Sequence, residues 1–207
     1  AIAHIVDTQF RQVQQGDVLV NFHRPVPLDV TQDLQRLPGV INAEPYRTEP
    51  VRMHLRGRSE DAAILGLVDG AELLRVVDEQ RGPVKLPAEG LVISSLLARS
   101  IGARTGDRME VEFRLWNQTR TTVAVVDTVH TMMGKQAFMR LYALNRLSRD
   151  GDGASEAALQ VDPLAMPAFW AAVKKAPLVN AVFDKAGTMA SFNETTSRNM
   201  GVFSGIL

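Results

Sequence analysis

The sequence predicts an α+β fold: a discontinuous ferredoxin-like lobe built from two βαβ units, an inserted β-rich lobe between the units, and a helix at each end. Three observations lead to this prediction. They are an approximate internal repeat, a change to short strands and turn signals between its two copies, and apolar residues at helical spacing near both termini. The 207 residues, 45% of them hydrophobic, are enough to form proper cores.

The first βαβ copy follows a predicted N-terminal helix, which is indicated by helically spaced apolar residues at the start of the chain. The copy begins with the strand Val18–Phe22, continues with a short helix over 28–37, and ends in the extended run Val40–Leu55. Pro45 and Pro50 within that run predict an edge strand or a bend, because proline cannot donate a hydrogen bond inside a central strand.

The inserted lobe opens with a strand over Ala62–Leu67 and a helical turn or strand over Ala71–Val77. A strand–helix–turn–strand module follows over Gly90–Phe113. Ser94 can cap the helix of this module, and Gly102 ends it, because a helix commonly closes on a glycine in the left-handed conformation.

The module's helix carries Leu96, Leu97 and Ile101 at helical spacing, so these side chains are expected to face the core. A turn at Gly106-Asp107 leads into a strand with one wet face and with inward residues Met109, Val111 and Phe113. A β-hairpin with its tip near Asn117 comes next, and Leu141–Leu147 is expected to be a helix.

The second βαβ copy is related to the first by a shift of 139 residues, which places Val18–Phe22 on Ala157–Val161 and Pro38 on Pro177. The four strands are therefore expected in one sheet with both helices on the same face, and chance similarity between two amphipathic units is the alternative. The predicted boundaries are 1–15 for the N-terminal helix, 16–56 and 154–187 for the ferredoxin-like lobe, 57–153 for the inserted lobe and 188–207 for the C-terminal helix.

Composition argues against several classes of function. Lys and Arg together number 23, as do Asp and Glu, so no net field favours nucleic acid. The absence of cysteine excludes disulfides and thiolate metal sites. The four histidines lack metal-ligand spacing and no serine has a nucleophile-elbow motif, so we expect neither an enzyme nor a cofactor. A carboxylate dyad assembled by the fold is the alternative.

Two glycine-containing segments resemble ligand loops only in part. Gly102–Asp107 lacks the Lys-Ser/Thr that a phosphate loop requires, and turn chemistry explains its glycines. Asp150–Gly153 opens like a calcium loop, but the twelfth position is Val161 where a bidentate glutamate is needed. Neither nucleotide nor calcium binding is therefore predicted.

Four residues form the candidate partner surface: Trp116, Asn117, Met132 and Met133. An aromatic residue at a projecting hairpin can anchor a partner, and packing over the adjacent sheet is the alternative. Adjacent methionines can supply an adaptable apolar contact, with core packing as the alternative.

The run Val92–Ala98, followed by Gly102-Ala103 and Gly106-Asp107, resembles a run in the extracytoplasmic domains of FtsX/MacB-type permeases of ABC transporters. Three further stretches resemble the same family in the same order, and with the first they cover most of the chain: Leu37–Pro45, Ile64–Leu67 and Met189–Met200.

The resemblance implies a MacB-like periplasmic core domain, with a porter-type lobe of two βαβ units and an inserted lobe, between two helices of the bacterial inner membrane. It implies no catalytic residue in this domain. The implied partners are an ATP-binding subunit or domain, a second permease copy, and an extracytoplasmic protein or lipid-like substrate.

The implied function is the coupling of ATP-driven motion to events outside the membrane, and a stand-alone periplasmic binding or sensor module is the alternative. If residues 1–15 and 188–207 are membrane-proximal helices, both should leave the same end of the domain, with the inserted lobe away from them. Met200–Leu207, which has no charged residue, is consistent with the start of a longer hydrophobic segment.

Overall fold

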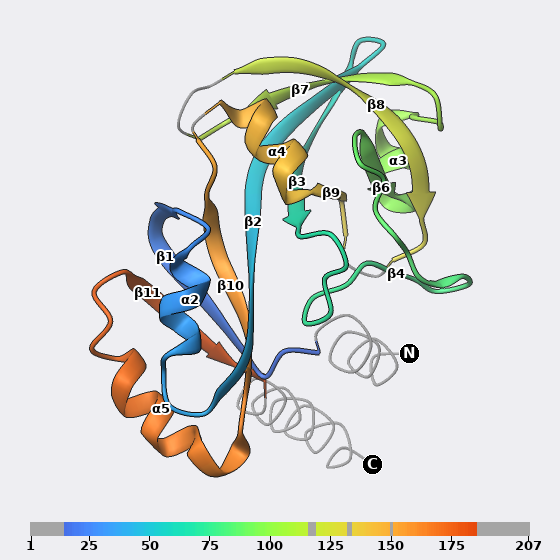
Figure 1. The fold of residues 1–207 in the computed structure, drawn as a ribbon. Coiled ribbons are helices and arrows are strands. Elements are labelled where there is room, and N and C mark those ends of the chain that lie inside the picture. Colours follow the sequence, from blue (N-terminus) through green and yellow to red (C-terminus); the bar gives the residue numbers. More distant parts are fainter. Residues whose placement is uncertain (1–14, 116–118, 132–133, 150, 186–207) are drawn as a thin grey trace, which may run out of the picture.

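The computed structural model describes residues 15–115, 119–131, 134–149 and 151–185. Within them, a nine-stranded sheet has the order β11-β1-β10-β2-β3-β9-β6-β8-β7, and β2 also pairs with β7. This extra pairing divides the sheet into a four-stranded end and a closed ring of six strands (Figure 1). The fold is α+β and is dominated by its sheet, with few helices.

The four-stranded end contains both βαβ units. Its elements are β1 (Val18–Val26), α2 (Val30–Gln35), the first half of β2 (Val40–Leu55), β10 (Ala154–Val161), the 3-10 turn η2 (Pro163–Ala165), α5 (Met166–Val173) and β11 (Val179–Asp184). Every neighbouring pair in the order β11-β1-β10-β2 is antiparallel. The four predicted strands therefore lie in one sheet, as expected.

Both helices of this end cover the same face of the sheet. Leu34 of α2 and Phe169 and Val173 of α5 belong to one buried cluster, together with inward residues of the strands such as Val20 and Leu159. Matched apolar stripes in the two copies thus fill a common core, which is what the repeat predicted.

Strand β2 is central rather than an edge strand or a bend, so that expectation is wrong. It pairs with β3 along one edge, and with β10 and then β7 along the other. The Pro50 carbonyl accepts from the Arg114 N–H at 3.3 Å, so it points to the edge of β2 that pairs with β7. The N and O of one strand residue point to the same edge, so the Pro50 nitrogen also faces this edge, just before the β7 pairing begins at Val51. Pro45 faces the opposite edge, just beyond the last β3 pair at Tyr46. Neither proline interrupts a ladder.

The six-stranded ring contains β2 and five strands of the inserted segment: β3 (Arg58–Leu67), β6 (Leu91–Ser94), β7 (Arg108–Phe113), β8 (Arg120–Val129) and β9 (Gln136–Arg140). Inside it, Met53 of β2 packs in one cluster with Leu97 of α3 (Ser95–Ile101) and Leu144 of α4 (Leu141–Ser148). Closure by the β2–β7 pairing gives β7 a partner on its outer edge, which would otherwise invite association with another chain.

The predicted module around α3 forms. The Ser94 Oγ accepts from the Leu97 N–H at 3.2 Å, and Gly102 ends the helix with a φ of 74°. The predicted inward residues of β7 are all buried. Leu96 was wrongly expected in the core: its side chain is 40% exposed, and Ala98 is buried instead.

The connection between β3 and β6 has little regular structure, so the expected helical turn or strand over Ala71–Val77 is wrong. Only its last residue enters a strand, the two-residue β4 (Val77–Asp78), which pairs with β5 (Gly82–Pro83). Leu74, Val76 and Leu86 nevertheless bury against Phe138 in a second cluster, which covers the outside of the ring.

The two ends of the described chain meet at the start of β1. The Lys185 N–H donates to the Asp17 carbonyl at 2.9 Å. The predicted terminal helices and hairpin tip lie largely or wholly outside the described residues. The expectation that the inserted segment lies away from these ends is wrong for Leu73, whose carbonyl accepts from the N–H groups of Gln15 and Gly16. No helix in the described part of the chain is both long and apolar enough to cross a membrane.

Candidate functional site

The predicted partner surface cannot be placed. Trp116, Asn117, Met132 and Met133 all lie outside the described residues.

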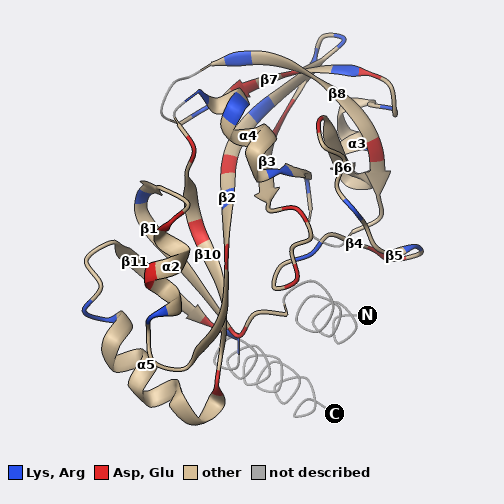
Figure 2. Ribbon diagram, viewed as in Figure 1, with Lys and Arg blue, Asp and Glu red and all other residues tan. Residues whose placement is uncertain are grey.

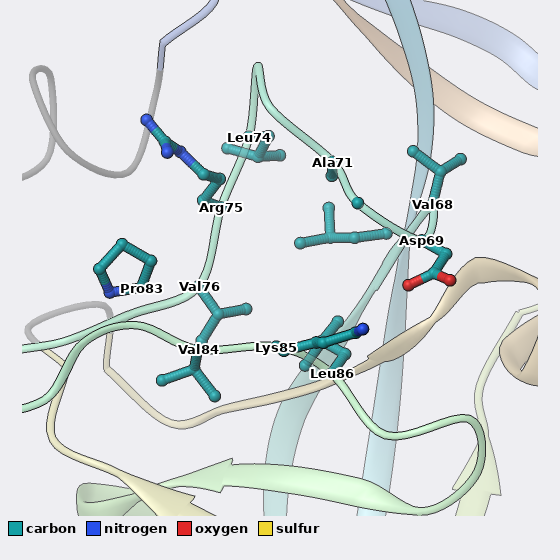
Figure 3. Close-up of a pocket in the computed structure, with 12 residues that line it drawn as sticks. Val68, Asp69, Ala71, Leu74, Arg75, Val76, Pro83, Val84, Lys85 and Leu86 are labelled. Carbon is teal, nitrogen blue, oxygen red and sulfur yellow. The ribbon is translucent and has the colours of Figure 1, made fainter.

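A pocket of about 370 Å³ lies beneath the irregular segment that follows β3 (Figure 3). Its walls are mainly apolar and come from Leu67, Leu74, Val76, Val84 and Leu86. Three charged residues also line it: Asp69, Arg75 and Lys85. The sequence did not reveal this site, because the local pattern over Ala71–Val77 indicated only a helical turn or strand.

Glu44 of β2 anchors the first part of the segment over residues 68–86, which covers the pocket. Its carboxylate accepts from the Glu72 N–H at 2.9 and 3.1 Å and from the Leu73 N–H at 2.9 Å. Hydrogen bonds to a charged acceptor are stronger than those between neutral groups. This contact anchors the inserted segment to the four-stranded end of the sheet.

Asp78 anchors the later part of the same segment. This buried carboxylate accepts from the N–H groups of Gln80, Arg81 and His130, each at 2.8–2.9 Å. Burial by itself would raise the pKa of Asp78, but the hydrogen bonds from His130, Arg81 and Gln80 hold that pKa well below its usual range. The pocket wall is thus attached at both sides by carboxylate–backbone contacts.

The rim carries opposite charges with different partners. Asp69 pairs with Arg140 at 3.0 Å, and the Arg140 Nε donates to the Leu86 carbonyl at 3.2 Å. Lys85 is exposed and forms no ion pair within the described part of the chain. Arg75 places its Nε in a buried position without a hydrogen-bond partner among the described atoms.

A buried polar group lies where β2 passes from one core to the other. Arg47 and Glu49 point to the same face of β2 and form an ion pair of 2.6 Å, and the Arg47 Nη1 donates to the Asn145 Oδ1 at 3.0 Å. On the other face, burial and then the Glu156 carboxylate raise the pKa of Tyr46. Burial also raises the pKa of Glu156 itself.

The charges are otherwise spread over the molecule. Figure 2 shows acidic and basic positions interspersed along both parts of the sheet. The described residues contain no group of three or more His, Asp or Glu side chains that could hold a metal ion. What the arrangement offers is a preformed apolar pocket and a continuous strand that joins two packed lobes.

Comparison with solved structures identifies the fold. The periplasmic region of MacB from Actinobacillus actinomycetemcomitans superposes with a TM-score of 0.54 at 9% identity, covering 91% of this chain and 97% of that one. The chain has the fold of a MacB-type extracytoplasmic domain. The extracellular domain of the noncanonic ABC-type transporter YknZ from Gram-positive bacteria gives a TM-score of 0.52 at 13% identity, over 70% of this chain and 82% of that one.

Among the comparisons with known proteins, those with solved structures give a match. No protein family and no curated protein sequence matches the chain. At such low identity, the likeness concerns the arrangement of strands and helices and carries no site residue from one protein to the other.

Proposed function

We propose that this chain is the extracytoplasmic domain of an ABC transporter permease subunit. In this role it couples motion driven by a separate ATP-binding subunit to the handling of a substrate or partner outside the inner membrane. The fold match carries the proposal, because it covers 91% of this chain and 97% of the MacB periplasmic region. The adjacent positions of Asp17 and Lys185 support it, since a domain inserted between two membrane helices needs both connections on one side.

The proposed mechanism is mechanical rather than catalytic. The strand order β11-β1-β10-β2 supports a ferredoxin-like porter-type lobe, and the six-stranded ring supports an inserted lobe over 57–153. The 16 residues of β2 belong to both. A displacement at the membrane-proximal end would therefore reach the far end of the ring through a continuous hydrogen-bonded strand, without a flexible linker that could absorb it. A second permease copy and an extracytoplasmic partner complete the proposed assembly.

A stand-alone periplasmic binding module is a second candidate, and the apolar pocket beneath residues 68–86 favours it. The two proposals differ in what they require. A permease domain requires an ATP-binding partner, whereas a binding module requires only its ligand.

The test uses the full-length protein purified from its own membranes. We expect an ATP-binding subunit to co-purify. Because residues 1–207 contain no cysteine, Arg120→Cys introduces a single labelling site within this domain, at the exposed start of β8. Spin-label distances between two copies should then differ between nucleotide-free and vanadate-trapped complexes. A hydrolysis-deficient ATP-binding subunit is the control and should abolish the vanadate-dependent change. The permease proposal would be contradicted if no ATP-binding partner co-purified and the spin-label distance between copies did not change with nucleotide.

A further inference from the structure

The pocket beneath residues 68–86 has the properties of a ligand site rather than of a packing defect. Its volume of about 370 Å³ lies within the range of small-molecule sites, near the lower end. The wall residues Leu74, Val76 and Leu86 are themselves buried in the core that covers the ring. Glu44 and Asp78 attach the surrounding segment to the sheet, so the pocket is formed before any ligand arrives.

The charges at the rim select among apolar ligands. Asp69 is neutralised by Arg140 at 3.0 Å. Figure 3 shows the Lys85 side chain extending along the cavity, whereas the Arg75 guanidinium points away from it. Lys85 is exposed and has no ion-pair partner in the described part of the chain, so its ammonium group is available to a ligand. A cation beside an apolar cavity is complementary to a molecule with an apolar body and an anionic end.

We propose that this pocket binds a single-chain amphiphile with an anionic head group. The chain of the ligand lies against Leu74, Val76 and Leu86, and the head group accepts a charge-assisted hydrogen bond from the Lys85 Nζ. The small volume favours one acyl-type chain over a two-chain lipid. This inference concerns the pocket alone and does not depend on the permease assignment, so it can be tested on the chain without membrane partners.

Calorimetric titration with three twelve-carbon probes tests the proposal, with the two ionic probes below their micelle-forming concentrations and the neutral probe below its solubility limit. Dodecanoate is the anionic probe, dodecan-1-ol the neutral one and dodecyltrimethylammonium the cationic one. We expect dodecanoate to bind most tightly. Lys85→Gln should weaken dodecanoate binding by about tenfold, the effect of losing one charge-assisted hydrogen bond at an exposed rim. The same substitution should leave the affinity for dodecan-1-ol unchanged.

Lys174→Gln is the matched control, because it removes an exposed lysine next to α5, in the other lobe. It should bind all three probes as the unmodified chain does. Thermal unfolding checks that Lys85→Gln, an exposed substitution, leaves the fold intact. Methyl NMR locates the ligand, with dodecanoate expected to shift Leu74, Val76 and Leu86.

Four results would overturn the inference. They are no measurable binding of dodecanoate, equal binding of the anionic and cationic probes, full dodecanoate affinity in Lys85→Gln, and shifts confined to methyl groups outside the pocket. The permease assignment has different readouts, namely the ATP-binding partner and the distance between copies, so failure of one proposal is distinguishable from failure of the other.

Discussion

The buried ion pair of β2 makes a sharp prediction about stability. Arg47 is fully buried and Glu49 is 2% exposed. Their side chains lie 2.6 Å apart, and Asn145 accepts a second hydrogen bond from the Arg47 guanidinium. This group separates the core of the four-stranded end, which contains Ala43, from the core of the ring, which contains Val51. Both cores lie on the same face of one strand.

Glu49→Gln removes the carboxylate that forms the 2.6 Å ion pair with the fully buried Arg47. Removing one partner of a buried pair costs about 3–5 kcal/mol of unfolding free energy. Replacing both partners, as in Arg47→Met with Glu49→Leu, removes both buried charges. This double variant still loses the donor to Asn145, at a cost of about 1–3 kcal/mol. The double variant should therefore be more stable than either single variant.

Urea unfolding at neutral pH, followed by circular dichroism, measures these differences. Arg114→Met is the control, because the Arg114 and Asp61 side chains are 49% and 69% exposed and loss of their ion pair should cost under about 1 kcal/mol. If the double variant loses the sum of the two single losses, the pair is not a coupled buried unit and the reasoning is refuted. A loss below about 1 kcal/mol in Glu49→Gln would refute it equally.

Three further substitutions test other contacts. Asp78→Asn should cost about 2 kcal/mol at pH 7, because charge-assisted hydrogen bonds to a buried carboxylate are lost. Since the folded pKa of Asp78 is depressed, its contribution is complete above its ordinary value of about 3.9 and is lost as the pH falls below it. The unfolding free energy of the variant should thus fall less steeply with acid; an unchanged acid slope would contradict this. Glu44→Gln should raise the hydrogen-exchange rate of the Leu73 amide about tenfold, as measured by NMR, without a comparable change inside the ring. Gly90→Ala should cost about 3 kcal/mol in urea unfolding, because Gly90 has a φ of 91° and an added Cβ would lie 2.4 Å from the Val126 Cγ2; a neutral result would show that this turn relaxes.

Local patterns in the sequence determined the elements that depend on nearby residues. The cap at Ser94, the helix end at Gly102 and the inward face of β7 could all be predicted, because each depends on side chains within a few positions. The repeat likewise predicted four strands in one sheet, since equivalent apolar stripes need equivalent partners.

Pairing between distant segments was decided only by the tertiary structure. Pro45 and Pro50 favoured an edge strand locally, yet β2 is central. The prolines are tolerated because each proline nitrogen faces a neighbouring strand just outside the residues that pair with that strand. Leu96 matched the helical spacing as well as Ala98 did, but the direction in which α3 crosses the ring buries Ala98. Closure of the ring depends on β2 meeting β7, and no local pattern encodes that contact.

The candidate site shows the same division most clearly. Several pocket residues lie in Ala71–Val77, where the local pattern predicted a helical turn or strand and indicated no cavity. Two carboxylates that accept from backbone N–H groups hold the segment in place. Glu44 of β2 accepts from Leu73, and Asp78 of β4 accepts from Arg81 in the turn that follows it. The sequence by itself determined the fold class, the repeat and the caps, because these follow from neighbouring residues. The tertiary structure decided the ring, the central place of β2 and the pocket, because these depend on contacts between segments that are far apart in the chain.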